Sequence, residues 1–369
     1  MQEEKLKIVH IIPNLRKGGA ERLVQDVCNY IFQNQLAHIK LVTFHKNVAV
    51  KFPFHVNIPS KFNLSITKKS KGNIIELQNF IENFKPDIIH SHLWESEMLL
   101  TNIKHEDCTR FTHFHDNMVQ LKKKLLPNSK IELTNMYEKR LFLKNNNNHF
   151  ICIAKDSFQF ALKSLPKKNR IHLIPNAIDY LNFHLSIKRN YREIRMINIG
   201  SFVKKKNQTL AVHILKNLIE EGYTASLTFL GDGKLKKDVE KLSTSLGINK
   251  YTKFLGNVEN VQEHLINSNI YLHTATYEPF GLVLLEAMAS GLPVISLNGK
   301  GNNDLIENGK NGYIFEEENP NLFSQKIIHI YKNHNEREIL IQNGFSTAKK
   351  HDIKEYTENL ISCYFSAIK

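Results

Sequence analysis

The sequence predicts an α/β protein built from two doubly wound domains, each with a parallel sheet covered by helices. Short apolar runs rich in β-branched residues alternate with longer amphipathic stretches, and this alternation occurs in two successive series. Such alternation is typical of parallel strands that are connected through helices. The length of 369 residues also exceeds what a single core usually organises. We therefore expect two Rossmann-like domains.

Each series supplies the strands of one expected sheet. The strand candidates of the first series lie at 7–12, 39–44, 87–91, 110–114, 149–154 and 171–175. Those of the second series lie at 195–200, 226–231, 252–256, 269–274 and 293–297. Helical patterns fill most gaps, for instance 206–221, 234–246 and 319–332.

The stretch 176–195 (NAIDYLNFHLSIKRNYREIR) loses the apolar period and is polar and basic, as a linker between domains would be. We therefore expect an amino-terminal domain at 1–187 and a carboxyl-terminal domain at 188–350. A last helix candidate at 351–369 is compatible with either domain, and we assign it to the first.

The charge of the chain is strongly positive and uneven. The formal net charge is +14, and residues 1–187 hold 27 Lys and Arg against 16 Asp and Glu, whereas residues 188–369 hold 23 against 20. Basic clusters occur at 68–71 (KKSK) and 122–124 (KKK). A basic face suits an anionic membrane surface, a polyanion or a phosphorylated substrate, and the plain alternative is a solvated surface.

The remaining composition favours an intracellular protein. The four cysteines are scattered without a Cys-x-x-Cys pair, so we expect reduced thiols. No run of eighteen apolar residues is present, and the acidic start does not resemble a signal peptide. We expect a cytoplasmic location, peripheral at the inner face of the cytoplasmic membrane if the basic domain binds anionic lipid.

The stretch 276–296 (TYEPFGLVLLEAMASGLPVIS) carries two carboxylates in an otherwise apolar segment. Pro279 favours an extended residue before it and a helix after it, so Glu278 is expected on a loop. The helix is expected from about Gly281 to Ser290, since Gly291 is a natural left-handed stop. Glu286 then lies in the second turn, where a lone buried carboxylate is costly unless it has a partner.

The expected start of this helix is a candidate anion site. The backbone N–H groups of Phe280, Gly281 and Leu282 would be free there and carry partial positive charge, which favours a phosphate or a sugar hydroxyl. A carboxylate repels a phosphate, so Glu286 is more suited to accept hydrogen bonds from hydroxyls, for which a ribose diol is a bidentate match. The alternative is that Glu278 and Glu286 are ordinary surface charges.

At these residues the chain resembles the retaining glycosyltransferases of family 4, which have the GT-B fold, with two Rossmann-like domains facing a central cleft. EPFGLVLLE (278–286) resembles their Glu-x7-Glu signature. The resemblance is strong over roughly 195–315 and looser in the first half. The other segments that carry it, in chain order, are GGAERLV (18–24), THFHDN (112–117), IPNAID (174–179), IGSFVKKKNQTL (199–210), FLGDG (229–233), FLGNV (254–258), SGLPVIS (290–296) and NGYIF (311–315).

The resemblance implies transfer of a sugar from a nucleotide diphosphate, most simply a UDP-sugar, with retained anomeric configuration. The donor would bind the second domain. The acceptor, a glycan or a polyprenyl-diphosphate-linked glycan as in bacterial surface polysaccharide assembly, would bind mostly the first. Glu278 maps to the residue at the donor sugar and reacting centre, and Glu286 to the residue that binds the ribose. No cofactor and no divalent metal is expected, because basic side chains and amides neutralise the diphosphate.

Three further segments supply candidate site residues. Lys206 maps to the diphosphate-binding lysine of the family, and a cation there stabilises the leaving diphosphate. Many members have arginine where this chain has Ser201, so Lys206 is left with more of the charge, with help from Lys204 or Lys205.

Gly18 and Gly19 follow the first strand and precede a helix, where their amides are suited to a diphosphate or an acceptor. The alternative there is a plain tight turn. His115 matches the family's cleft histidine, whereas His90, His92 and His113 are expected to be structural.

Three other hypotheses stay open at this point. The first is a GT-B relative that epimerises a sugar nucleotide, the second is a nucleic-acid-binding protein driven by the positive charge, and the third is a catalytically inactive nucleotide-sugar sensor. The second lacks a recognisable binding module, so no nucleic-acid partner is expected.

Overall fold

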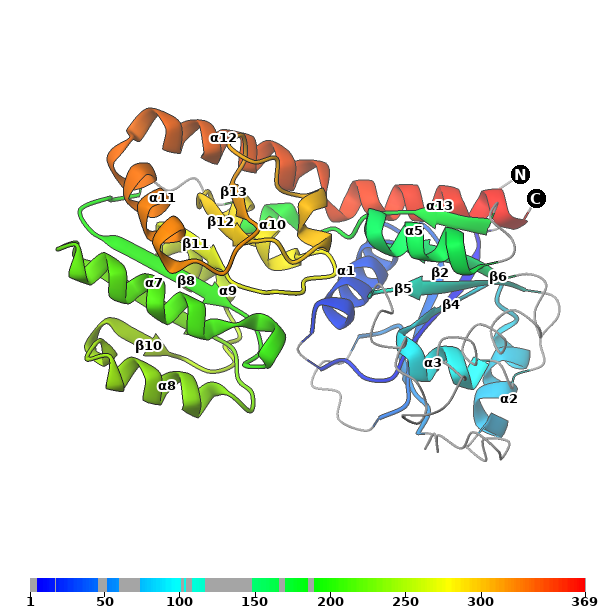
Figure 1. Cartoon of the computed structure of the whole chain (residues 1–369). Helices are drawn as coiled ribbons and strands as arrows, with labels where there is room; N and C mark the ends of the chain where they lie inside the picture. The colour runs from blue at the N-terminus through cyan, green and yellow to red at the C-terminus, as the bar shows by residue number, and fades with distance from the viewer. Residues whose placement is uncertain are drawn as a thin grey trace. The chain divides into compact units, whose positions relative to one another are not determined.

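The computed structural model describes residues 5–16, 18–45, 52–59, 74–100, 103, 108–116, 148–165, 170–184 and 189–368. The chain forms two compact units (Figure 1). Unit 1 comprises Met1–Asn176 and Ile353–Lys369, and unit 2 comprises Ala177–Asp352. The basic clusters at 68–71 and 122–124 lie outside the described residues.

Unit 1 contains a parallel sheet with the strand order β3-β2-β1-β4-β5-β6-β7. Its strands are β1 Lys7–Ile12, β2 His38–Thr43, β3 His55–Asn57, β4 Ile88–His92, β5 Thr109–Phe114, β6 Asn148–Cys152 and β7 Ile171–Leu173. The order reverses between β1 and β4, which makes this the topological switch point of the sheet. In open α/β sheets, ligands bind outside the carboxyl ends of the strands at such a point.

The described helices of unit 1 pack apolar side chains onto this sheet. They are α1 Gly19–Gln33, α2 Ile74–Phe84, α3 Leu93–Leu100, α5 Lys155–Ser164 and α13 Ile353–Ile368. One core cluster joins β1, β2 and β4 to α2 and α3, and includes Val9, Leu77 and Ile89. The last helix, α13 (red in Figure 1), returns to unit 1 and packs beside α1.

Unit 2 contains a second parallel sheet with the order β10-β9-β8-β11-β12-β13. Its strands are β8 Ile194–Ile199, β9 Ala225–Leu230, β10 Thr252–Phe254, β11 Ile270–His273, β12 Val294–Leu297 and β13 Tyr313–Phe315. Here the switch point lies between β8 and β11. The sequence prediction of two doubly wound parallel domains is therefore confirmed.

The α-helices of unit 2 are α6 Tyr180–Phe183, α7 Gln208–Glu220, α8 Lys236–Ser245, α9 Val261–Ile266, α10 Leu282–Ala289, α11 Pro320–Lys332 and α12 His334–Lys350. Short 3-10 turns lie at η3 Lys204–Lys206, η4 Asn249–Tyr251 and η5 Gly301–Asp304. The core joins α7 and α11 to the sheet through side chains such as Leu215, Phe229 and Ile327, all fully buried.

The division between the units falls at Asn176, whereas the linker composition placed it at residue 187. The difference arises because α6 belongs to unit 2, where it packs against α10. Phe183 is buried there, and its carbonyl accepts a hydrogen bond of 3.2 Å from the Ser290 hydroxyl. Two buried side chains in one short turn are too few to show a helical period.

Within the described ranges, no helix combines the length and the apolar character that crossing a membrane requires.

Candidate active site

The candidate site of unit 2 lies where β8 and β11 end, at the switch point of the sheet. The segment after β8 supplies Lys206, and the end of β11 with the segment after it supplies His273 and Glu278. Because β8 and β11 are adjacent parallel strands, their carboxyl ends bring residues about 70 positions apart in the sequence to one place.

The loop after β8 is fixed to the segment after β11 by hydrogen bonds to its backbone. The amide of Thr276 donates to the carbonyl of Lys205 at 2.9 Å, and the hydroxyl of Thr274 donates to the carbonyl of Lys206 at 3.0 Å. The aliphatic stem of Lys206 passes over Gly200, where an added Cβ would meet its Cδ at 3.5 Å. The position of the Lys206 ammonium is therefore set by the strand ends.

Glu278 is a buried carboxylate held by two basic side chains. Lys206 Nζ donates to Glu278 Oε2 at 2.5 Å, and His273 Nε2 lies 3.2 Å from the same oxygen. Burial by itself raises the pKa of Glu278, but Lys206 and His273 outweigh it, so that the pKa falls to about 2. Glu278 is therefore ionised at neutral pH and accepts hydrogen bonds rather than donating a proton.

The backbone of Glu278 is held by the segment that follows β12. The amide of Glu278 donates to the carbonyl of Gly299 at 2.8 Å, and the amide of Gly301 donates to the carbonyl of Glu278 at 3.0 Å. A Cβ at Gly301 would lie 2.0 Å from the carbonyl oxygen of Pro279, so only glycine permits this close approach. Three segments of the chain thus position one carboxylate.

The start of α10 has the geometry that the sequence predicted. Gly281 is the residue before the helix, with φ 105° and ψ 56°, and Gly291 ends the turn after it at φ 71°. No described backbone carbonyl accepts from the amides of Phe280, Gly281 or Leu282. The ring of Phe280 is itself buried, edge-on to His351, so Phe280 has only its amide to offer a ligand.

Glu286 lies in α10 and is only 4 % exposed. It belongs to the same electrostatic environment as Glu278, because the charges of both carboxylates act on the buried phenol of Tyr271. Burial raises the pKa of Tyr271, and Glu278 and Glu286 raise it further. The two glutamates therefore border one region at the switch point.

Lys205 and Ser201 lie on the exposed side of the loop after β8. The ammonium of Lys205 lies 5.3 Å from the ring centroid of Tyr277, a cation–π contact that keeps it beside the segment leading to Glu278. Unlike Lys206, Lys205 makes no ion pair that the structure records among the described residues.

Gly18, Gly19 and His115 belong to unit 1. Gly18 precedes α1 and Gly19 is its first residue. The carboxylate of Glu21 folds back over Gly18, where an added Cβ would meet Glu21 Oε2 at 2.2 Å. Burial raises the pKa of Glu21, while its own backbone amide and Arg16 lower it. An anion that approaches these amides must first displace this side chain.

His115 follows β5 and ends a hydrogen-bonded chain through the interior of unit 1. His115 Nε2 is 3.0 Å from His92 Nδ1, and His92 Nε2 is 2.9 Å from His10 Nδ1. His10 Nε2 is 3.2 Å from the hydroxyl of Tyr364 on α13, which is 2.5 Å from His90 Nδ1. His113 stacks on His115 with ring centroids 4.1 Å apart.

These histidines are neutral near pH 7. Burial lowers the pKa of His10 and of His115 to about 3, and it lowers those of His90, His92 and His113 well below their ordinary value. The strand register explains the cluster, because His10 pairs with His90 and His92 with His113 on neighbouring strands. Two groups of three have nitrogens within 4.8 Å of one another and are suited to a metal ion: His10, His90 and His92, and His92, His113 and His115.

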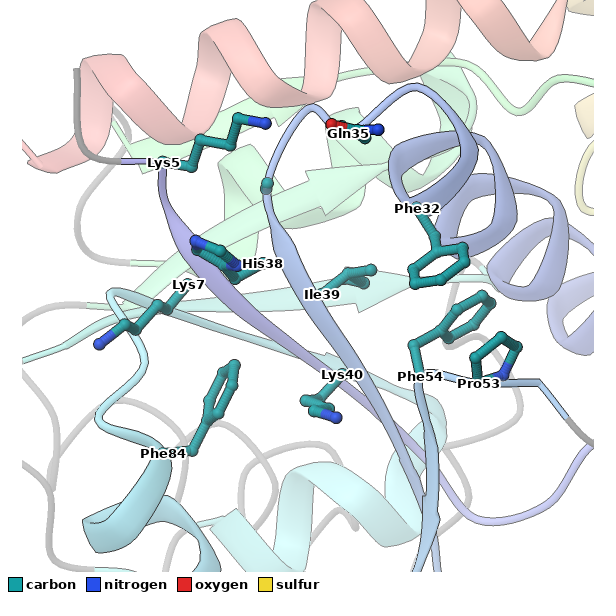
Figure 2. A pocket seen from close by; sticks show the side chains of 11 residues that line it. Lys5, Lys7, Phe32, Gln35, His38, Ile39, Lys40, Pro53, Phe54 and Phe84 are labelled. Atoms are coloured by element: carbon teal, nitrogen blue, oxygen red, sulfur yellow. The ribbon is translucent and has the colours of Figure 1, made fainter. Parts of the chain in front are cut away.

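A cavity of about 440 Å³ lies at the other end of the sheet of unit 1, near the amino ends of β1 and β2 (Figure 2). The rings of Phe32 and Phe54 pack together at its wall, with centroids 5.2 Å apart, and Lys5, Lys7 and Lys40 also line it. None of the predicted site residues contributes to this cavity.

The sequence reasoning missed His273, His10 and Tyr364. A signal for His273 exists, because it is the last residue of a strand that ends at the switch point. No local signal marks His10 or Tyr364, since their contact joins residues at opposite ends of the chain.

Two family models match the chain in succession. The model for Glycosyltransferase Family 4 matches residues 17–180, and the model for Glycosyl transferases group 1 matches residues 182–347. Together they cover both units. A curated relative from Escherichia coli, a UDP-Gal:alpha-D-GlcNAc-diphosphoundecaprenol alpha-1,3-galactosyltransferase, is 25% identical over 318 residues, or 78% of this chain and 79% of that protein.

Other relatives match a smaller part. A poly(ribitol-phosphate) alpha-N-acetylglucosaminyltransferase from Staphylococcus aureus is 25% identical over 185 residues, which is 50% of this chain and 37% of that protein.

Solved structures share the fold over nearly the whole chain. A glycosyltransferase from Rickettsia africae has a TM-score of 0.78 at 15% identity and covers 99% of both chains. Alr3699/HepE from Anabaena, solved with UDP and glucose, has a TM-score of 0.78 at 15% identity, covering 97% of this chain and 98% of its own. With both family models matched in order along the two doubly wound units, the chain belongs to the family 4 type of glycosyltransferases and has the GT-B fold.

Proposed function

We propose that this glycosyltransferase moves a sugar from a UDP-sugar to a hydroxyl of a glycan or lipid-linked glycan, with retention of configuration. The observation that carries the proposal is the arrangement of Lys206, Glu278 and His273 beside the start of α10. It combines a fixed cation, an ionised carboxylate and unengaged backbone amides at one switch point. A sugar nucleotide needs these three groups for its diphosphate and its hydroxyls.

Each group takes one part of the donor. The diphosphate binds the amides of Phe280, Gly281 and Leu282 and the ammonium of Lys206, which has further N–H groups beyond the one bonded to Glu278. Lys205 and the hydroxyl of Ser201 assist from the exposed side of the loop. Glu286 accepts hydrogen bonds from the ribose diol, and Glu278 accepts them from the sugar.

Retention follows if the acceptor attacks on the face from which the diphosphate leaves. The acceptor oxygen bonds to the anomeric carbon, the bond to the phosphate oxygen breaks, and the acceptor proton passes to that departing oxygen. Glu278 does not serve as nucleophile in this scheme, because Lys206 and His273 already engage its carboxylate. Lys206 supplies the positive charge, so the transfer itself runs without a cofactor or a divalent cation.

We assign the acceptor to the carboxyl edge of unit 1, where His115, Gly18 and Gly19 lie. The relatives from Escherichia coli and Staphylococcus aureus are named for a diphosphoundecaprenol-linked and a polymer-phosphate acceptor. The positive charge of residues 1–187 is compatible with such an acceptor held at an anionic membrane surface. A role in bacterial surface polysaccharide synthesis is the simplest setting for this chemistry.

Nucleotide binding tests the donor assignment most directly. We would compare UDP, GDP, ADP and NAD by thermal unfolding of the wild type and of Glu286→Gln. At about 100 times its Kd, UDP is expected to stabilise the wild type by roughly 2.7 kcal/mol, and Glu286→Gln to lose most of that gain. Glu220→Gln removes a carboxylate that pairs with Lys216 on the surface of α7 and serves as the control.

Two outcomes contradict the proposal. Equal stabilisation of the wild type and Glu286→Gln by UDP would remove Glu286 from the ribose site. Stabilisation by GDP, ADP or NAD without UDP would replace the donor. Retention is checked separately, by comparing the anomeric configuration of product and donor with NMR.

A further inference from the structure

We propose that His92, His113 and His115 form a Zn²⁺ site at the carboxyl edge of unit 1, and that the bound ion inhibits sugar transfer by occupying His115. The three rings meet because β4 and β5 are in register, with His92 opposite His113, and His115 follows two positions later on the same face. Ring centroids are 5.1 Å apart for His92 and His113, and 5.3 Å for His92 and His115.

One pair of nitrogens in this group is close to the spacing that a metal ion imposes. Tetrahedral Zn²⁺ with Zn–N bonds of about 2.0–2.1 Å places neighbouring ligand nitrogens roughly 3.4 Å apart. His92 Nδ1 and His115 Nε2 are 3.0 Å apart, so these rings need to separate by only a few tenths of an ångström. The ligand atoms of all three residues already lie within 4.8 Å of one another.

His113 supplies an independent reason to expect an ion. It is 1 % exposed, and the one side-chain hydrogen bond recorded for its ring is to Asn176, so one ring nitrogen stays without a partner. A buried polar atom without a partner costs about 1–3 kcal/mol, and ligation of a metal removes that cost for one nitrogen.

The chain of hydrogen bonds behind the group has the form of an outer shell. A histidine that ligates through one nitrogen carries its proton on the other, and that N–H needs an acceptor. If His92 ligates through Nδ1, its Nε2–H donates to His10 Nδ1 at 2.9 Å. His10 Nε2 in turn lies 3.2 Å from the hydroxyl of Tyr364. The tautomers of all the hydrogen-bonded histidines are therefore compatible with ligation of a metal by His92.

The donor set selects the kind of ion. Three imidazole nitrogens suit Zn²⁺ and neighbouring transition metals, whereas Mg²⁺ and Ca²⁺ prefer oxygen ligands. No carboxylate or thiolate joins this group in the part of the chain that the structure describes. The second histidine group is less suited, because His10, His90 and His92 are at most 2 % exposed, whereas His115 is partly exposed.

Metal binding is tested on the full chain, freed of any histidine tag and treated with a chelator. Titration of Zn²⁺ against a competing chromophoric chelator is expected to give one ion per chain for the wild type. Loss of an outer-shell partner typically weakens binding about 10–100-fold, so His113→Asn, which loses a ligand, is expected to weaken it by more than roughly 100-fold. His172→Asn is the matched control, and its affinity is expected to equal that of the wild type.

A second variant separates ligation from folding, because His113→Asn changes a fully buried residue. This variant is His115→Ala, since His115 is the partly exposed end of the hydrogen-bonded series of histidines. It is expected to lose the ion, while its melting temperature without metal stays close to that of the wild type. Co²⁺ gives a further readout. We expect the wild type with Co²⁺ to show the intense visible absorption that is typical of a tetrahedral site, and the two variants to lack it. Equal Zn²⁺ affinity in the wild type and both variants would overturn the site.

The inhibitory effect rests on the proposed function and is measured separately. One equivalent of Zn²⁺ is expected to abolish transfer by the wild type, and a chelator to restore it. Stoichiometric binding without inhibition would leave the metal site in place and remove His115 from the transfer. Absence of binding would overturn the metal site, while the nucleotide test in unit 2 would still decide the proposed function.

Discussion

The carboxyl edges of the two sheets have the same topology but differ in charge, because one is lined by neutral side chains and the other by charged ones. In unit 1, the switch point between β1 and β4 is lined by imidazoles that burial keeps neutral. In unit 2, the switch point between β8 and β11 carries a buried ion pair, in which Lys206 and His273 keep Glu278 ionised. One fold therefore provides a neutral polar surface in one unit and fixed charges in the other.

This difference fits the two substrates of a sugar transfer. Fixed charges suit a diphosphate, because a preorganised cation stabilises the negative charge that develops on the leaving group. Neutral imidazoles donate and accept hydrogen bonds without repelling or attracting ions, which suits the hydroxyls of an acceptor. The two sheets therefore share one topology, and a few side chains after the strands determine whether the edge suits a diphosphate or hydroxyl groups.

The largest expected effect comes from removing the charge of unit 2. Glu278→Gln keeps the shape of the side chain but leaves Lys206 without its buried partner and the sugar without an anionic acceptor. We expect kcat to fall roughly 10²–10³-fold, as for loss of a single preorganised group. The measurement is initial rate of sugar transfer at saturating donor.

Glu307→Gln is the matched control for this change. Glu307 pairs with Lys310 at 2.6 Å on the surface of the same unit, and the loss of an exposed pair is expected to leave kcat unchanged. An unaltered rate in Glu278→Gln, or an equal fall in both variants, would show that the buried pair has no special part in transfer.

The second prediction concerns acid, to which the two edges respond in different pH ranges. The pKa of His10 is lowered to about 3, so the unfolded chain binds more protons than the folded one below about pH 6.5, and stability falls as the pH drops from there towards 3. The pKa of Glu278 is lowered to about 2, so its contribution is complete above about 4.5 and falls only below that pH.

Between pH 7 and pH 5, a histidine whose pKa is lowered to about 3, as for His10 and His115, costs about 2 kcal/mol of folding free energy. Unit 1 has five histidines with a lowered pKa in one cluster, and at the switch point of unit 2 burial lowers the pKa of His273. Hydrogen exchange, corrected for the intrinsic rate, is expected to rise first in β4 and β5. Earlier loss of protection in β8 and β11 would contradict this order.

The smallest effect is expected from Tyr364→Phe, which breaks the histidine chain in unit 1. Removing the hydroxyl leaves His10 Nε2 and His90 Nδ1 without their partner in a fully buried place, at a cost of about 1–3 kcal/mol. Chemical denaturation measures this loss. Tyr180→Phe is the comparison, since its hydroxyl bonds His184 at 2.9 Å in a partly exposed part of unit 2, where water can replace it.

If Tyr180→Phe lost as much free energy of unfolding as Tyr364→Phe, burial of the hydrogen-bonded histidines would add nothing to the strength of their hydrogen bonds.

The sequence predicted those features that local chemistry determines. Pro279, Gly281 and Gly291 fix where α10 begins and ends, because proline and glycine restrict the backbone in known ways, and the helix bounds agree. The strands β3 and β13 were missed, whereas β7 and β10, which are equally short, were predicted. Neither partner of Glu278 was predicted, since Lys206 was assigned to the diphosphate and His273 reaches Glu278 through strand pairing rather than through spacing in the chain.

The hydrogen bond between His10 and Tyr364 joins two residues of unit 1, of which one is synthesised before unit 2 and the other after it. The interior of unit 1 therefore stays incomplete until α13 has emerged, by which time all of unit 2 has been made. Domains usually fold in the order of their synthesis. Here the strands made first cannot complete their packing, because the hydrogen bonds of His10 and His90 to Tyr364 are still missing. Unit 2 is therefore the first part of the chain that is able to reach its final packing.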